Sequence, residues 1–133
     1  MSVMDVRQLE AVIGTKLGAD DRVAAVYLFG SQARGTPHAR SDIDLAVLFV
    51  STPPATLLGQ PFELQAELSA LLGEPVDIVV MNSAPVDLVH RILRDGRILL
   101  ERDRSRRIAF EVQARNQYFD LLPILQRYRK QSA

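Results

Sequence analysis

Two observations in this 133-residue sequence predict a single α/β domain, in which a small mixed sheet is flanked by helices and followed by a C-terminal helix. Short, continuous apolar runs typical of buried strands alternate with segments in which apolar residues recur at helical spacing. Hydrophobic residues make up 47% of the chain and charged residues 24%, the balance expected of a soluble domain with one core. We therefore expect a core over residues 1–101 and a helical segment over residues 102–133.

The first half of the chain predicts a helix and then two strands. Asp5 and Gln8 have the spacing of a capping box, apolar residues follow at helical spacing, and Gly18 is placed to end the helix. Residues 23–29 are almost wholly apolar and rich in valine and aromatic residues, which indicates a strand buried on both faces. The second strand, 42–50, begins with acidic residues and continues with apolar ones.

The second half predicts three more helices and two strands. The first helix is opened by Pro61 and closed by Gly73, and one of its faces carries Leu64, Leu68, Leu71 and Leu72. A strand at 76–81 follows, and then a helix that is capped by Asn82 or Ser83 and runs to about Arg94. A weaker strand at 97–101 leads to the last helix, from 103 to about 128. Pro123 lies inside the last helix and is expected to kink or divide it.

The composition excludes several classes of protein and site. The chain has no cysteine and only two histidines, so a disulfide framework and a thiolate or histidine-rich metal site are not expected. Sixteen basic residues balance sixteen acidic ones, which argues against direct nucleic-acid binding through bulk charge. Its apolar runs are shorter than the roughly 20 residues that span a bilayer. We therefore expect no membrane partner and a cytoplasmic location.

The strongest chemical signal is a pair of aspartates at the start of the second strand. Asp42 and Asp44 are two positions apart, so on a strand their side chains point to the same face. Aspartate is disfavoured in strands, and two adjacent carboxylates repel each other unless a cation lies between them. Taken alone, the pair also fits an exposed strand start where one carboxylate makes a turn contact.

A third carboxylate favours the metal site. Asp77 interrupts the apolar run of the third strand, and it meets Asp42 and Asp44 if the second and third strands are neighbours. Clustered carboxylate oxygens favour magnesium or manganese, and two such ions stabilise the attacking and leaving oxygens of a phosphoryl displacement. Without the pair, Asp77 fits an exposed edge strand equally well.

The Gly30-Ser31 dipeptide follows the first strand directly. A glycine at this point allows the backbone to approach a ligand closely, and amides at the start of a short helix bind phosphate. As an isolated dipeptide it also fits an ordinary turn. Its fixed distance from Asp42 and Asp44 makes it informative.

Together these residues carry a resemblance to a known family. Gly30-Ser31, ten intervening residues and Asp42-Ile-Asp44 form the GS–x10–DxD pattern of the DNA polymerase beta-like nucleotidyltransferases. The longer string GSQARGTPHARSDIDLAVLF resembles the minimal nucleotidyltransferase branch, and Asp77 matches its usual third carboxylate. With the order of elements, the resemblance extends over about residues 5–101, and it implies the single-domain nucleotidyltransferase fold.

The resemblance also implies roles for individual residues. The triphosphate of ATP would lie against Gly30 and Ser31, and Asp42 and Asp44 would hold two magnesium ions. Asp77 would complete the metal site and help to deprotonate the acceptor hydroxyl. Arg34 would either bind phosphate oxygens or pair with an acidic residue, and the sequence does not favour one role over the other.

The missing domains suggest which acceptor is used. At 133 residues there is no room for the template- or RNA-binding domains of larger relatives. The sequence resembles the antitoxin of HEPN/MNT toxin–antitoxin pairs, which implies a protein adenylyltransferase that transfers AMP to a tyrosine of a HEPN ribonuclease toxin, in a possible hetero-oligomer with it. The alternatives are an antitoxin that only masks the toxin and a nucleotidyltransferase acting on an antibiotic.

The C-terminal helical segment fits a protein partner. It has two apolar faces, of which one can pack on the core and the other suits a partner. The first face consists of Ile108, Val112, Phe119 and Leu122. The second face consists of Phe110, Ala114, Tyr118, Leu121 and Leu125. The alternative is that the domain's own helices bury both faces.

Overall fold

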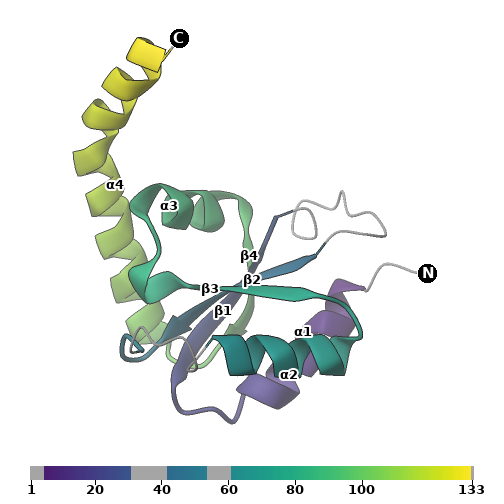
Figure 1. The fold of residues 1–133 in the computed structure, drawn as a ribbon. Helices are drawn as coiled ribbons and strands as arrows, with labels where there is room; N and C mark the ends of the chain where they lie inside the picture. The colour runs from purple at the N-terminus through teal and green to yellow at the C-terminus, as the bar shows by residue number, and fades with distance from the viewer. Residues whose placement is uncertain (1–4, 31–41, 54–60, 133) are drawn as a thin grey trace.

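The structure is a computed structural model that describes residues 5–30, 42–53 and 61–132. Four strands form one mixed sheet in the order β3-β2-β1-β4 (Figure 1). The strands are β1 (Val23–Phe29), β2 (Ile43–Phe49), β3 (Val76–Val80) and β4 (Arg97–Glu101). β1 runs antiparallel to both β2 and β4, whereas β2 and β3 are parallel. This arrangement confirms the predicted small mixed sheet.

The helices cover both faces of the sheet. α1 (Val6–Leu17) and α2 (Phe62–Leu72) pack on one face, and α3 (Val86–Asp95) and α4 (Arg104–Ser132) pack on the other (Figure 1). On β2, Ile43, Leu45 and Val47 point to the α1/α2 face, whereas Ala46 and Leu48 point to the α3/α4 face. This alternation gives each face its own apolar core, and it fixes the direction of every other β2 side chain.

The predicted helix ends of α1 and α2 are confirmed. The Asp5 carboxylate accepts a hydrogen bond from the amide of Arg7, and Asp5 and Gln8 form the expected capping box. Gly73 ends α2 in the left-handed region at φ 70°. Leu71, however, is wrongly predicted to lie on the buried face of α2, because it is 58% exposed while Leu64, Leu68 and Leu72 are buried.

The predicted cap of α3 is also wrong. Residues Met81–Ser83 form a short 3-10 turn, and α3 begins only at Val86, after Pro85. The Asn82 side chain instead bonds to both backbone groups of Phe49, with N–O distances of 2.9 Å in each direction. A side chain that satisfies the end of β2 in this way is not free to cap a helix.

α4 is longer than predicted. It runs without a break from Arg104 to Ser132, so Pro123 does not divide it. A proline in a helix leaves the carbonyl four residues earlier without its usual partner. That carbonyl belongs to Phe119, in a stretch of α4 that is largely exposed, where water can bind it.

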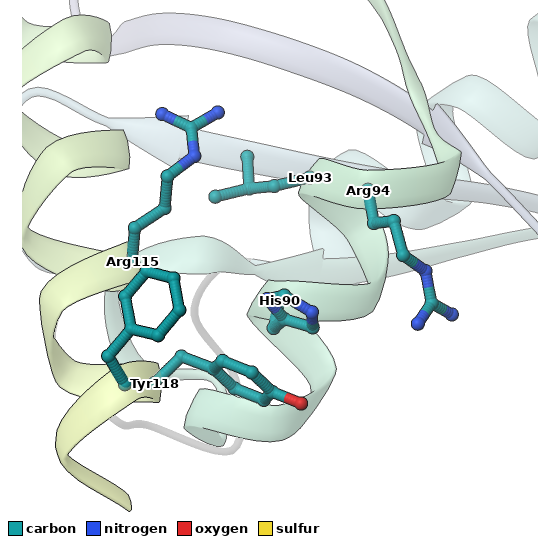
Figure 2. A pocket seen from close by; sticks show the side chains of 6 residues that line it. His90, Leu93, Arg94, Arg115 and Tyr118 are labelled. Carbon is teal, nitrogen blue, oxygen red and sulfur yellow. The ribbon is translucent and has the colours of Figure 1, made fainter. Parts of the chain in front are cut away.

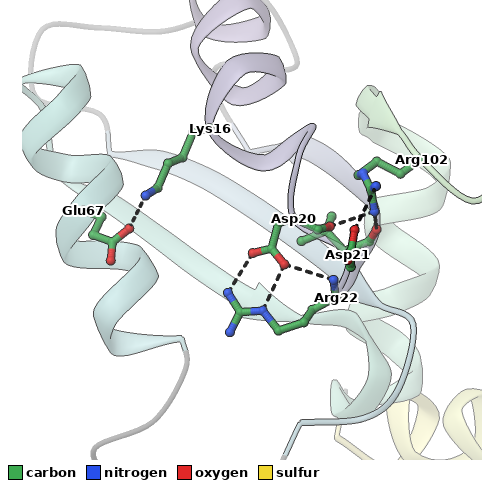
Figure 3. A network of polar contacts seen from close by, with 7 residues as sticks. Lys16, Asp20, Asp21, Arg22, Glu67 and Arg102 are labelled. Atoms are coloured by element: carbon green, nitrogen blue, oxygen red, sulfur yellow. Dashed lines mark hydrogen bonds and ion pairs between the residues drawn. The ribbon is translucent and has the colours of Figure 1, made fainter.

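Polar contacts join α1, α2, the turn before β1 and Arg102, which follows β4 (Figure 3). Lys16 of α1 pairs with Glu67 of α2. Asp20 accepts two hydrogen bonds from the Arg22 guanidinium, at 2.9 and 2.7 Å. Arg102 donates to the carbonyls of Gly18, Asp20 and Val23, so it ties the turn before β1 to the residues that follow β4.

A second polar cluster attaches α4 to the sheet. Glu111 is buried, and its carboxylate accepts hydrogen bonds from the Tyr27 hydroxyl at 2.8 Å and from Arg107 at 2.7 Å. Burial and the neighbouring carboxylate raise the pKa of Tyr27 well above its usual range, so the phenol stays protonated as the donor. No helix within the described ranges is both long and apolar enough to cross a membrane.

Candidate functional site

The two predicted strands bring their carboxylates together. In the parallel pairing of β2 with β3, Asp44 lies directly opposite Asp77. On its other side Asp44 pairs with Phe29, the last residue of β1. Asp42 lies just before β2, near enough to Asp77 for its carboxyl group to raise the pKa of Asp77. The structure therefore places all three predicted carboxylates at one end of the sheet.

The alternation of the strands decides which face these carboxylates occupy. Ile43 and Leu45 point to the α1/α2 face, so Asp44 between them points to the α3/α4 face. Val76 and Ile78 enclose Asp77 in the same way. The carboxylates therefore protrude on the side of the sheet that α3 and α4 partly cover.

The electrostatics of this cluster favour a bound cation. Burial raises the pKa of Asp44, and the negative charges of Asp77 and Asp42 raise it further. Partial desolvation raises the pKa of Asp77, as do the hydrogen bond and the charge of the Asp42 carboxyl group. The ionised forms of Asp44 and Asp77 are thus destabilised by their surroundings, and a cation or a proton relieves that repulsion.

These residues fit magnesium that is shared with a nucleotide. In residues 5–30, 42–53 and 61–132, no group of three or more His, Asp or Glu side chains is close enough to hold a metal ion by itself. Magnesium in nucleotide-dependent enzymes is usually held by one or two carboxylates, with substrate phosphates and water as the other ligands. The adjacent carboxylates of Asp42, Asp44 and Asp77 meet that requirement in pairs.

Gly30 brings the end of β1 against the carboxylates. Its backbone is in the left-handed region at φ 76°, which favours glycine. A Cβ atom at this position would lie 2.4 Å from Oδ2 of Asp44, well inside van der Waals contact. Any side chain here would displace that carboxylate. The predicted Ser31 and Arg34 lie outside the described residues, so their predicted roles at the nucleotide stay predictions.

A hollow opens between α3 and α4 on the same side of the sheet (Figure 2). Its volume is about 290 Å³, and it is lined by His90, Leu93, Arg94, Arg115, Tyr118 and Phe119. The rings of His90 and Tyr118 are stacked, with centroids 3.5 Å apart and an interplanar angle of 3°. The hollow was not predicted from the sequence, because its lining comes from two helices that no spacing rule connects.

Comparison with known families agrees with this geometry. The family model described as "Polymerase beta, Nucleotidyltransferase" matches residues 13–105, a stretch that includes Gly30 and all three carboxylates. The chain belongs to this nucleotidyltransferase family. Family membership and the observed sheet together confirm the fold class predicted from the GS–x10–DxD pattern.

The chain is similar to several curated members of the family. It is 36% identical over 78 residues to the protein adenylyltransferase MntA of Shewanella oneidensis, a match that covers 59% of this chain and 54% of that protein. It is 30% identical over 98 residues to the protein adenylyltransferase MntA of Thermococcus cleftensis, covering 71% of this chain and 96% of the relative. The match to the S. oneidensis protein thus spans about half of that relative's length.

Solved structures extend the similarity over α4. A toxin–antitoxin structure with AMP-PNP contains a chain with a TM-score of 0.78 and 26% identity, and the match covers 97% of this chain and 98% of that one. A structure of tri-AMPylated Shewanella oneidensis HEPN toxin in complex with MNT antitoxin matches with a TM-score of 0.73 and 26% identity, covering 95% and 98%. The similarity therefore includes the C-terminal helix, which lies mostly beyond the residues that the family model matches.

Proposed function

We propose that this protein is an adenylyltransferase antitoxin, which transfers AMP from Mg-ATP to a tyrosine of a cognate HEPN toxin and neutralises it. The observation that carries the proposal is the register that sets Asp44 opposite Asp77, with the Gly30 backbone against Asp44. The relatives support the choice of reaction and acceptor, since two of them are named protein adenylyltransferases and the solved complexes contain a HEPN toxin.

The residues divide the reaction between them. Asp42 and Asp44 would hold two magnesium ions on the triphosphate, and these ions supply charge stabilisation for the displacement. The backbone at Gly30, with Ser31, would orient the phosphates, and Arg34 would bind them. Asp77 would accept the proton of the tyrosine hydroxyl. The phenol oxygen forms a bond to the α-phosphorus as the bond to the bridging β-phosphate oxygen breaks, and pyrophosphate leaves.

The test is intact-mass analysis of the HEPN toxin paired with this chain, after incubation with ATP and magnesium. We expect the toxin to gain one or more AMP units with the wild-type protein and none with Asp42→Asn/Asp44→Asn. Glu10→Gln/Glu63→Gln is the matched control, because it also removes two negative charges but does so at exposed positions on α1 and α2. This control should transfer AMP at the wild-type rate.

Other outcomes would select the alternative functions. A stable complex with the toxin and no mass gain with any nucleotide would indicate an antitoxin that only masks the toxin. Transfer to an aminoglycoside hydroxyl without transfer to the toxin would indicate an antibiotic-modifying enzyme.

A further inference from the structure

α4 extends beyond the domain that it stabilises. Its 29 residues contact β1 and α3 only in part, and Glu111 and Ala114 are its buried residues among those with described side chains. From Phe119 to Lys130 every side chain is exposed or half-buried. Figure 1 shows this part of α4 projecting past α3. A projection of this length is not needed to complete the core.

The exposed part of α4 includes apolar and aromatic surface. Phe119 is 65% exposed and Ile124 is 49% exposed. Phe119 also lines the hollow between α3 and α4, where its ring lies edge-on to that of Tyr118, with centroids 6.4 Å apart. Exposed aromatic residues beside a preformed hollow are typical of the anchor positions of a protein interface.

The charge of α4 indicates what kind of partner fits. The helix carries seven arginine or lysine residues and two acidic residues, a net charge of +5. Because the whole chain has sixteen of each sign, the other 104 residues carry nine basic and fourteen acidic side chains, a net charge of −5. Arg127 and Lys130 lie on the projecting end and are exposed, beside a second hollow of about 440 Å³. From Phe119 to Lys130 the helix carries three basic residues and one acidic residue, a net charge of +2, so the surface that complements this end is acidic.

The position of this surface relative to the carboxylates favours a large acceptor. Asp44 and Asp77 point to the same face of the sheet that α3 and α4 occupy, and α3 lies between α4 and that end of the sheet (Figure 1). An α-helix with its side chains is about 10 Å wide. A small molecule bound at α4 could not present a hydroxyl group across α3, whereas a folded protein could.

We infer that the hollow between α3 and α4, together with the projecting end of α4, docks an acidic segment of the acceptor protein. The juxtaposition of Phe119, Arg127 and Lys130 on one projecting helix, on the carboxylate side of the sheet, carries this assignment. This inference rests on the proposed function, because it requires that the acceptor of AMP is a protein. The docked acceptor covers α4 and reaches over α3, so its hydroxyl group meets Asp77.

Two variants and one matched control test the docking surface. Arg127→Glu/Lys130→Glu reverses the charge of the projecting end, and Phe119→Ser removes the aromatic anchor. Arg7→Glu/Arg104→Glu is the control, since it reverses two exposed arginines on α1 and at the opposite end of α4. Each protein is assayed with the HEPN toxin paired with this chain, for the Kd of the complex and for KM and kcat of AMP transfer at 50 and 300 mM salt.

The expected result is a selective loss of acceptor affinity. Both test variants should raise Kd and KM for the toxin by about tenfold or more, with kcat at saturating toxin and the thermal shift with Mg-ATP unchanged. The charge-reversed variant should also lose most of the salt dependence that the wild-type protein shows. The control should stay within about twofold of wild type, as expected for surface charges outside an interface.

Other results separate this inference from the proposed function. If the wild-type protein modifies the toxin and both test variants keep its KM, the docking surface is wrong and the proposed function stands. If the wild-type protein binds the toxin without modifying it, the proposed reaction fails, and a Kd raised by both variants still supports the surface. If Arg127→Glu/Lys130→Glu converts a dimer of this chain to a monomer and leaves KM unchanged, α4 is an interface between copies and the inference is overturned.

Discussion

Two glycines in this fold share a backbone conformation but differ in their surroundings. Substituting each of them therefore distinguishes the effect of backbone strain from the effect of a displaced active-site carboxylate. Gly30 and Gly73 have φ values of 76° and 70°. A Cβ at Gly73 would meet nothing within 4 Å, whereas a Cβ at Gly30 would lie 2.4 Å from Oδ2 of Asp44. Alanine at either position is therefore strained by its backbone, and only alanine at position 30 also displaces a carboxylate.

The magnitudes follow from these distances. Alanine in the left-handed region costs about 1 kcal/mol after its benefit in the unfolded chain is subtracted, so both variants should lose about 3–5 °C of Tm. Ordinary van der Waals contact begins at 3.4 Å, so Oδ2 of Asp44 must move by about 1 Å in Gly30→Ala. A displacement of that size in a reacting constellation costs about a hundredfold in rate. We expect Gly73→Ala to transfer AMP at nearly the wild-type rate and Gly30→Ala at about one hundredth of it.

The assay measures thermal unfolding and AMP transfer to the HEPN toxin on the same protein samples. Equal loss of activity in both variants would attribute the effect to general destabilisation. Full activity in Gly30→Ala would refute the argument that the close approach of the Gly30 backbone holds Asp44 in its working position.

Three further predictions concern the carboxylates and the attachment of α4. Asp44→Asn should raise Tm at pH 7 without magnesium, because the raised pKa of Asp44 means that its ionised form destabilises the fold. The difference in Tm between variant and wild type should shrink as pH falls through the pKa of Asp44, and a difference that does not change with pH would contradict this prediction. Mg-ATP at a hundred times its Kd should stabilise the wild-type protein by about 2.7 kcal/mol, read as a rise in Tm that is absent in Asp42→Asn/Asp44→Asn. In urea unfolding, Tyr27→Phe should lower the free energy of unfolding by about 1 kcal/mol and Glu111→Gln should lower it by about 2–3 kcal/mol. The second loss is larger because only Glu111→Gln leaves Arg107 without its charged partner on α4. Equal losses would show that the tyrosine hydrogen bond dominates.

The sequence alone predicted the features that depend on periodicity and on a fixed motif. Strands β1 and β2 were predicted from short apolar runs, and the meeting of the three carboxylates was predicted on the condition that β2 and β3 are neighbours. The position of Asp77 opposite Asp44 needed only that the strands be neighbours. These features are local in sequence or are required by the chemistry, so no tertiary contact could override them.

Features made by contacts between distant segments were not predicted. Asn82 bonds to Phe49 and Glu111 bonds to Tyr27, across 33 and 84 positions of sequence, and neither pair has a recognisable spacing. The contacts of Arg102 and Arg107 with groups within the domain likewise have no signal in the sequence. Side chains that satisfy a particular backbone end or buried group can be identified only once the packing is known.

The core itself forces the carboxylates into mutual repulsion. Two like charges about 5 Å apart on neighbouring strands repel by about 1–3 kcal/mol at effective dielectric constants of 80 to 20. A slip of β2 by one residue would separate them, but it would also turn Asp44 and Ala46 into the α1/α2 core and move Ile43, Leu45 and Val47 out of it. That core would then lose three large apolar side chains and gain a carboxylate, which costs several kcal/mol. Packing therefore wins over repulsion, and the register of the sheet is fixed by side chains that never contact the substrate. The repulsion is left to be relieved by a proton or a cation, and at neutral pH a magnesium-bound nucleotide fits that place.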